Sequence, residues 1–425
     1  MSADGGMPAV ERAVADAHRR EWAFVLAATA RIAGDFDVAE ECVQDAYIAA
    51  LDAWSRDGVP RKPGAWLTAT AKRKALDVLR RERVFRSKMP LLVEPDEAEM
   101  DVPDDDPVTD DRLRLIFTCC HPALAREAQA ALTLRLVCGV STGDIARAFL
   151  VSEPTMAARV TRAKKKISAA RVPYRVPGAA ELPERLDAVL TVIHLLYTTG
   201  HTAPSGTDLV RDDIVDRALD LARMLRALMP DEPEVRGLLA LLLVTDARRA
   251  TRSDAEGRLV LLEDQDRSAW DRAAIDEGRR LVVDAFRTGR VGRYALQAAI
   301  ASLHAEAPHY SSTDWQQVLG LYDRLLQVWS SPVVALNRAV AVSMVHGPGA
   351  ALDEIEALER DDRLAGYHYL PAVRADLLRR LGRHHEAATA YRAALKLADN
   401  AAEREFLAAR LADTVGSRSG RSPEA

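Results

Sequence analysis

The sequence predicts an all-α protein with two small helical domains, the second carrying a helix-turn-helix, followed by a C-terminal domain of α-α repeat-like helices. Alanine, leucine and arginine are abundant, and aromatic residues make up only 5% of the 425 residues. Such a composition favours helix over sheet. Apolar residues also recur at intervals of three and four in several long stretches, which is the helical period.

The overall composition is that of an ordinary globular protein, with 48% hydrophobic residues, 28% charged residues and a formal net charge of −5. The first residues lack a basic stretch followed by an apolar run, so we expect no signal peptide. The longest strongly apolar run, residues 238–244, is too short to span a bilayer. Four cysteines are too few for a disulfide scaffold. We therefore expect a cytoplasmic protein that does not bind membranes.

The first predicted domain, residues 9–90, begins with two helices separated by Gly34 and Asp35. The inward face of the second helix is predicted to consist of Val38, Cys42, Ala46, Ala49 and Ala53. Its outer face is polar, mostly acidic and predicted to be exposed, and it comprises Asp37, Glu40, Glu41, Gln44 and Asp45. Such a face is typical of a solvated helix, and it would also suit a basic partner.

A basic helix follows a loop with two glycines and two prolines, residues 55–64. Between Lys72 and Lys88 there are eight Lys or Arg residues and two acids, which gives a local charge of +6. One face of this helix is apolar and comprises Leu67, Ala71, Ala75 and Val78. The candidate DNA-binding residues are Arg61, Lys62, Arg73, Lys74, Arg80 and Arg81. Trp66, at the helix start, can either anchor the helix in the core or stack on a base.

An acidic linker is predicted at residues 91–111. Between Glu94 and Asp111 there are ten acids, three prolines and no base, and this composition opposes a folded core. The second domain is predicted at residues 112–172. Within it, one helix runs from Arg126 to Cys138 and ends at Gly139, and a short capped helix covers residues 144–149.

The next predicted helix is apolar on one face and basic on the neighbouring face. Ser152 caps it after a turn at residues 150–152. Its apolar stripe comprises Met156, Val160, Ala163 and Ile167. Its candidate DNA-binding residues are Thr155, Arg159, Arg162, Lys165 and Lys166. A short capped helix, a tight turn and a basic amphipathic helix form the helix-turn-helix pattern, in which the second helix enters the major groove.

The rest of the chain is predicted to be a linker at residues 173–183, a helical domain at 184–412 and a disordered tail at 413–425. The linker contains three prolines and one glycine. Near the end, three positions of one helix correspond to three positions of another at an offset of 36 residues: Ala351, Ile355 and Leu358 to Ala387, Tyr391 and Ala394. This offset is close to the 34-residue period of tetratricopeptide repeats.

An enzymatic reading rests on a few reactive residues. Cys119, Cys120 and His121 are adjacent, which is not the spacing of a zinc site. The carboxylates of residues 261–271 could bind a metal or form ion pairs. Three histidines lie in apolar helices: His194, His201 and His304. We expect buried cysteines and core histidines, with no catalytic residue, no metal and no cofactor.

Three motifs carry a family resemblance. They are G-D-F-D-V-A-E-E-C-V-Q-D-A-Y (34–47), A-W-L-T-A-T-A-K-R-K-A-L-D-V-L-R-R (65–81) and G-V-S-T-G-D-I-A-R-A-F-L-V-S-E-P-T-M-A-A-R-V-T-R-A-K (139–164). In order, spacing and chemistry the chain resembles sigma-70-family RNA polymerase sigma factors of the extracytoplasmic-function type. Residues 110–124, 261–271, 297–305 and 331–342 resemble the subgroup with a tetratricopeptide-like C-terminal extension.

The resemblance implies a transcription initiation factor that binds core RNA polymerase and directs it to promoter DNA. The acidic face around Glu41 would dock on the clamp helices of the polymerase. The 55–64 loop would read the −10 element while Arg73, Lys74, Arg80 and Arg81 hold its backbone. The helix from Glu153 would read the −35 element, and the acidic linker would run through the polymerase channel that later takes RNA.

The C-terminal domain is expected to modulate activity, through a regulatory protein or a ligand. One alternative stays open: a helix-turn-helix regulator with a repeat-type interaction domain and no polymerase docking. That alternative explains residues 139–171 and the C-terminal half but leaves residues 34–83 unexplained.

Overall fold

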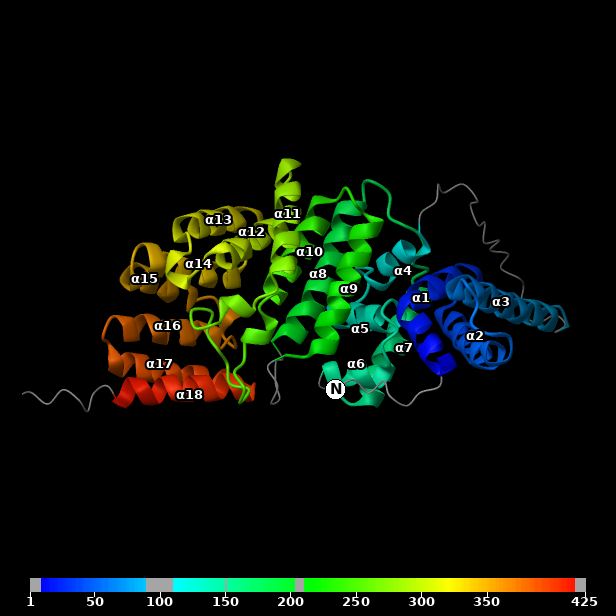
Figure 1. Cartoon of the computed structure of the whole chain (residues 1–425), viewed down its shortest axis with the longest axis horizontal. Coiled ribbons are helices and arrows are strands. Elements are labelled where there is room, and N and C mark those ends of the chain that lie inside the picture. The colour runs from blue at the N-terminus through cyan, green and yellow to red at the C-terminus, as the bar shows by residue number, and fades with distance from the viewer. Residues whose placement is uncertain (1–8, 89–109, 150, 203–209, 417–425) are drawn as a thin grey trace, which may run out of the picture. The chain divides into compact units, whose positions relative to one another are not determined.

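The structure is a computed structural model that describes residues 9–88, 110–149, 151–202 and 210–416. These residues contain eighteen α-helices, four short 3₁₀-helices and no β-strand, with one isolated bridge between Ser253 and Leu259 (Figure 1). The predicted all-α class is confirmed. The chain divides into two compact units, residues 1–195 and 196–425, and the division falls inside helix α8 (Leu182–His201).

Three long helices open the first unit: α1 (Ala9–Ala33), α2 (Phe36–Asp57) and α3 (Pro63–Lys88). Each packs against the other two. Gly34, with φ of +67°, ends α1 and lets the chain turn into α2. The side chain of Asp35 then caps α2 by accepting two backbone hydrogen bonds. Leu26, Val43 and Leu67 bring one fully buried side chain from each helix into the core.

Four shorter helices follow: α4 (Asp111–Cys119), α5 (Arg126–Leu136), α6 (Thr142–Ala148) and α7 (Glu153–Ala169). The predicted apolar stripe of α7 is confirmed, because Met156, Val160, Ala163 and Ile167 are all buried. Two predicted boundaries were slightly wrong. Helix α5 ends at Leu136 because the chain turns back there, with the amide of Val140 donating to the carbonyl of Leu134 at 3.0 Å. Helix α6 begins two residues early and ends one residue early.

Both predicted linkers border on helices. Of the acidic linker at 91–111, only Asp110 and Asp111 lie within the described residues, and Asp110 caps α4. Helix α8 begins at Leu182, inside the predicted second linker. That linker is anchored by Tyr174, whose hydroxyl donates to the carbonyl of Ala27 at 3.0 Å and whose ring lies edge-on to Phe36.

The second unit begins with the end of α8 and continues with α9 (Asp212–Leu228), α10 (Pro233–Asp246), α11 (Arg272–Arg287) and α12 (Arg293–Glu306). Helix α10 packs against α9, α11 and α12. The apolar run at residues 238–244 is accordingly buried along its whole length. Gly237 permits the close approach of α12, since a Cβ there would lie 2.5 Å from the backbone nitrogen of Ala295.

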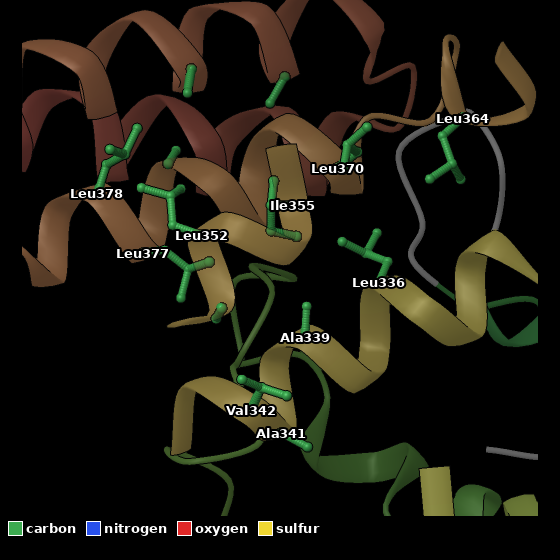
Figure 2. Packing of buried hydrophobic residues seen from close by; sticks show 14 of the residues in the cluster. Leu336, Ala339, Ala341, Val342, Leu352, Ile355, Leu364, Leu370, Leu377 and Leu378 are labelled. Carbon is green, nitrogen blue, oxygen red and sulfur yellow. The ribbon is translucent and has the colours of Figure 1, made fainter. Parts of the chain in front are cut away.

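Six further helices complete the unit: α13 (Trp315–Val328), α14 (Pro332–Val345), α15 (Pro348–Leu358), α16 (Tyr369–Arg380), α17 (His384–Leu397) and α18 (Ala401–Gly416). The 3₁₀-helices are Arg249–Thr251, Arg267–Ala269, Tyr310–Ser312 and Asp362–Leu364. Each of these six α-helices packs against the next one in sequence. This is the predicted α-α repeat-like packing, and Figure 2 shows leucines of α14, α15 and α16 pointing into one shared core.

The two helices with the 36-residue offset are α15 and α17. Ala351 and Ile355 in α15, and Ala387, Tyr391 and Ala394 in α17, are all buried. The first four residues of the predicted tail, 413–416, are instead helical, because α18 continues to Gly416. Residues 417–425 of that tail lie outside the described part of the chain.

Candidate nucleic-acid and protein interfaces

Helix α3 presents the basic surface that the sequence predicts. Leu67, Ala71 and Ala75 are fully buried against α1 and α2. Two of the predicted DNA-binding residues lie exposed in the loop before α3, and three lie exposed on the helix itself: Arg61, Lys62, Arg73, Arg80 and Arg81. The structure therefore gathers these cations on the side of α3 that faces away from the core.

Lys74 and Trp66 have packing partners within the same three-helix unit. The ammonium group of Lys74 lies 3.1 Å from a carboxylate oxygen of Asp45 on α2 and is partly buried. The ring of Trp66 lies edge-on to Trp54, with 5.7 Å between ring centroids, and Trp54 is buried. Of the two readings of Trp66, this contact favours the core anchor.

Helix α7 carries the second basic surface. The hydroxyl of Ser152 caps it by accepting a hydrogen bond from the amide of Thr155 at 3.3 Å. Because the apolar stripe faces inward, the neighbouring stripe faces out. Among its predicted DNA-binding residues, Thr155, Arg162, Lys165 and Lys166 are exposed and Arg159 is half-buried.

The outer face of α2 is partly acidic and partly apolar. Asp37, Glu41, Gln44 and Asp45 are exposed as predicted. Two apolar side chains extend this face toward the end of the helix: Ile48 is 61% exposed and Leu51 is 38% exposed. Sequence reasoning missed both, although they follow Gln44 at the helical intervals of four and seven residues. An exposed apolar strip beside acidic groups is typical of a protein-binding surface.

Glu40 was predicted to be exposed on this face, and that prediction was wrong, because its side chain is only 7% exposed. The reason is a contact that reaches far along the sequence. Its carboxylate forms an ion pair with Lys164 of α7 and lies 2.9 Å from Nε of Arg135 on α5. The ammonium group of Lys164 also binds Asp37 at 2.6 Å. The first unit thus has two halves, the three-helix half (α1–α3) and the helix-turn-helix half (α4–α7), and a buried carboxylate of the first is compensated by two cations of the second.

Other bonds support the same contact between the two halves of the first unit. The indole nitrogen of Trp22 on α1 donates to the carbonyl of Leu136 at the end of α5, at 3.0 Å. Gly139 lies against the same indole, and a Cβ at that position would come within 2.9 Å of the ring. Burial by itself would lower the pKa of Lys164, but Glu40 and Asp37 hold that pKa above its ordinary value. Lys164 therefore keeps its charge in this contact.

The two adjacent cysteines and His201 of the enzymatic reading are buried within the protein and His304 is half-buried, whereas Glu263 and Asp264 are exposed. Cys119 and Cys120 are buried. Burial raises the pKa of the Cys120 thiol to about 11, so this thiol forms little of the reactive thiolate at neutral pH. Burial lowers the pKa of His201 to about 2 and that of His304 to about 4, with nearby arginines adding to both shifts. Among the described residues no group of three or more His, Cys, Asp or Glu side chains could hold a metal ion.

The segments that carry these surfaces match known protein families. Residues 12–84 match sigma-70 region 2, residues 114–167 match sigma-70 region 4, and residues 185–286 match a family of unknown function, DUF6596. An uncharacterized protein of Rhizobium meliloti (strain 1021) is 45% identical over 378 residues, which are 88% of this chain and 89% of the relative. The crystal structure of yeast Tom70 has 13% sequence identity and a TM-score of 0.38, covering 97% of this chain and 86% of Tom70.

A helix that spans a membrane must be both long and apolar. In the part of the chain that the structure describes, no helix is both long enough and apolar enough to cross a bilayer.

Loss of the Lys164 charge is expected to open the contact between the two halves of the first unit. Lys164→Met leaves buried Glu40 with Arg135 alone, at a cost on the order of 2 kcal/mol, or about thirtyfold in the opening equilibrium. Exchange of the Trp22 indole proton, followed by NMR, should accelerate by that factor. Lys166→Met removes an exposed cation from the same helix and should leave the rate unchanged. Equal rates in the two variants would show that the ion pair does not hold the contact.

Proposed function

This chain belongs to the sigma-70 family of RNA polymerase sigma factors, and from that premise we propose how its surfaces act in transcription initiation. It is an alternative sigma factor that directs core RNA polymerase to promoters. The match of residues 12–84 to region 2 accounts for the segment that a regulator without polymerase docking leaves unexplained. The observation that carries the proposal is the pair of exposed basic surfaces, on α3 and on α7, within the two matched regions.

We propose that the outer face of α2 docks on the polymerase. Asp37, Glu41, Gln44 and Asp45 supply polar and acidic contacts for a basic partner, and Ile48 adds exposed apolar surface that is buried on binding. Glu40 joins this interface only after its contacts with Arg135 and Lys164 have separated. Docking of region 2 and release of the helix-turn-helix half are then coupled steps.

A charge placed at Ile48, on the apolar part of this face, tests docking. Ile48→Lys should weaken binding to core polymerase about tenfold or more, because it removes buried apolar area and adds a charge that must lose its water. Fluorescence anisotropy with a labelled full-length chain measures the affinity. Val328→Lys, at an apolar side chain of α13 that is 51% exposed, is the matched control. If both variants bind like the unmodified chain, α2 is not the docking surface.

We propose that the loop before α3 reads the −10 element and that α3 holds its backbone. Arg61 and Lys62 are exposed in the loop. Four cations of α3 lie along the path available to a strand: Arg73, Lys74, Arg80 and Arg81. Capture of unpaired bases offsets an unstacking cost of about a few kcal/mol per base. Promoter opening is therefore a shift in population, and it needs no covalent chemistry by the protein.

Arg80 and Arg81, in the C-terminal part of α3, test this role. Arg80→Ala with Arg81→Ala should lower promoter opening about tenfold and reduce the salt dependence of DNA binding by about two counterions. Permanganate reactivity of the −10 thymines measures opening. Polymerase affinity should stay within about twofold. The double variant Arg279→Ala with Arg280→Ala, at exposed positions of α11, is the charge-matched control. Loss of polymerase binding by the α3 variant would contradict the assignment.

We propose that α7 reads the −35 element in the major groove. Thr155, Arg159 and Arg162 lie along one stripe and would approach bases or backbone, with Lys165 and Lys166 on phosphates. Each bidentate base contact contributes about 1–3 kcal/mol of discrimination.

The proposed path of the acidic linker through the polymerase channel concerns residues that lie outside the described part, apart from Asp110 and Asp111. A cytoplasmic location follows from these partners.

We further propose that the C-terminal domain modulates sigma activity in cis. Support comes from α8, which contains the division between the two units. Within the first unit, Arg185 of α8 donates to the carbonyl of Phe117 at 2.6 Å, and Arg126 of α5 donates to the carbonyl of Ala188. The beginning of α8 is thus part of the helix-turn-helix half, so the same helix belongs to both units.

Truncation after α8 tests this modulation. A fragment of residues 1–202 keeps the bonds of Arg185 and Ala188, whereas a fragment of residues 1–175 would remove them. Run-off transcription by the 1–202 fragment with core polymerase should differ from that of the full chain by at least about fivefold, a typical coupling between sites. Equal transcription by fragment and full chain, at equal polymerase occupancy, would remove the need for a regulatory role.

A further inference from the structure

A cavity of about 310 Å³ lies in the second unit, lined by residues of α10, α12, α13 and α14 and of the loop before α11. Its apolar walls include Leu241, Ile300, Leu325 and the ring of Trp270. Polar side chains also line it: Thr245, Arg248, Gln297, His304, Tyr322 and Asn337. A volume near the lower end of the usual range, about 300–1,000 Å³, suits a small ligand. The transcription proposal assigns no role to this cavity.

Arg248 is the one arginine in the lining, and no Asp or Glu accompanies it there. Its neighbour Arg249 takes the nearby carboxylates, binding Asp212 at 3.0 Å, Asp216 at 2.9 Å and Asp246 at 2.8 Å. In the described part of the chain, no hydrogen bond or ion pair joins the Arg248 guanidinium to another group. The two adjacent arginines thus have different surroundings. Arg249 forms ion pairs with three carboxylates, whereas Arg248 lines the cavity.

Two other arginines, Arg252 and Arg267, act electrostatically on the groups around Arg248, and Glu403 offsets part of the charge of Arg252. Arg267 donates to the carbonyls of His304 at 2.5 Å and Ala307 at 2.9 Å. Arg252 donates to the carbonyl of His201 and to the hydroxyl of Thr202. All these acceptors are neutral. Burial lowers the pKa of Arg248, and Arg267 adds to the shift while nearby Tyr197 partly offsets it, which fits a cation without a paired carboxylate.

His304 contributes a neutral polar group rather than a second charge. Burial and the arginines Arg248 and Arg267 lower its pKa to about 4, so the ring is uncharged at neutral pH. Its Nδ1 atom is buried and has no hydrogen-bond partner. The remaining polar groups in the lining are hydroxyls and amides. The cavity therefore presents one positive charge, several neutral hydrogen-bonding groups and an apolar wall.

We propose that this cavity binds a small organic acid, whose carboxylate pairs with Arg248 and whose apolar body lies against Trp270 and the α10–α12 wall. A guanidinium matches a carboxylate in two parallel hydrogen bonds. A neutral ligand would leave Arg248 without an anion, and an inorganic anion would leave the apolar walls without a partner. The site does not depend on the transcription proposal, because binding is measured in the absence of polymerase and DNA.

The experiment is titration calorimetry of the full chain with three acids (phenylacetate, phenylbutyrate and octanoate), with phenylethanol as the neutral counterpart of phenylacetate and with inorganic phosphate. We expect at least one acid to bind at concentrations below about 10 mM, and phenylacetate to bind about tenfold more tightly than phenylethanol. Phosphate should bind more weakly than the best acid. Arg248→Gln should abolish the preference for acid over alcohol.

Two further variants make the result decisive. Arg290→Gln removes an exposed arginine of the same unit and should bind like the unmodified chain. Ala301→Leu keeps Arg248 but fills part of the cavity from α12, and it should lose acid binding even if Arg248→Gln fails to fold. The proposal is overturned if no acid binds, if phenylethanol binds as tightly as phenylacetate, or if folded Arg248→Gln or Ala301→Leu binds acids like the unmodified chain.

Discussion

The burial of one carboxylate, Glu40, constrains the whole first unit. An ionised carboxylate away from water needs compensation by opposite charge, and Glu40 obtains it from Arg135 and Lys164. These cations belong to the helix-turn-helix half, so α2, which we propose docks on the polymerase, and α7, which we propose reads DNA, share one electrostatic contact. Any arrangement that separates the two halves must give Glu40 another cation or return it to water.

A second ion pair connects the two proposed roles, docking through α2 and DNA opening through α3. Lys74 on the basic helix α3 lies 3.1 Å from Asp45 on the docking face, and both helices share a core with α1. The residues proposed to hold the −10 strand therefore lie in the same three-helix group, α1–α3, that is proposed to dock on the polymerase. A net charge of −5 hides this arrangement, because the sign of the charge is segregated by surface and not averaged over the chain.

Local periodicity predicted much of this design, and it failed where partners lie far apart in sequence. The apolar stripe of α7 and the basic arc of α3 follow from spacing alone, and both were predicted correctly. The burial of Glu40 could not be predicted in this way, since its compensating cations come from residues about a hundred positions later. Ile48 differs from these cases. The spacing of four residues between Gln44 and Ile48 is enough to place Ile48 on the outer face. The prediction instead followed the small apolar residues of the inward face.

The second unit shows why residue type alone does not define a site. Arg248 and Arg249 are neighbours on one turn, yet only Arg249 points to the carboxylates of α9 and α10. The sequence shows two arginines beside several acids, and a balanced cluster would be the natural reading. Packing assigns all three acids to one arginine and leaves the other in a cavity lined by neutral polar and apolar side chains, with no carboxylate. An uncompensated cation in such surroundings is costly to the protein alone, and the cost is removed when an anion arrives, which is what makes the position suited to binding rather than to stability.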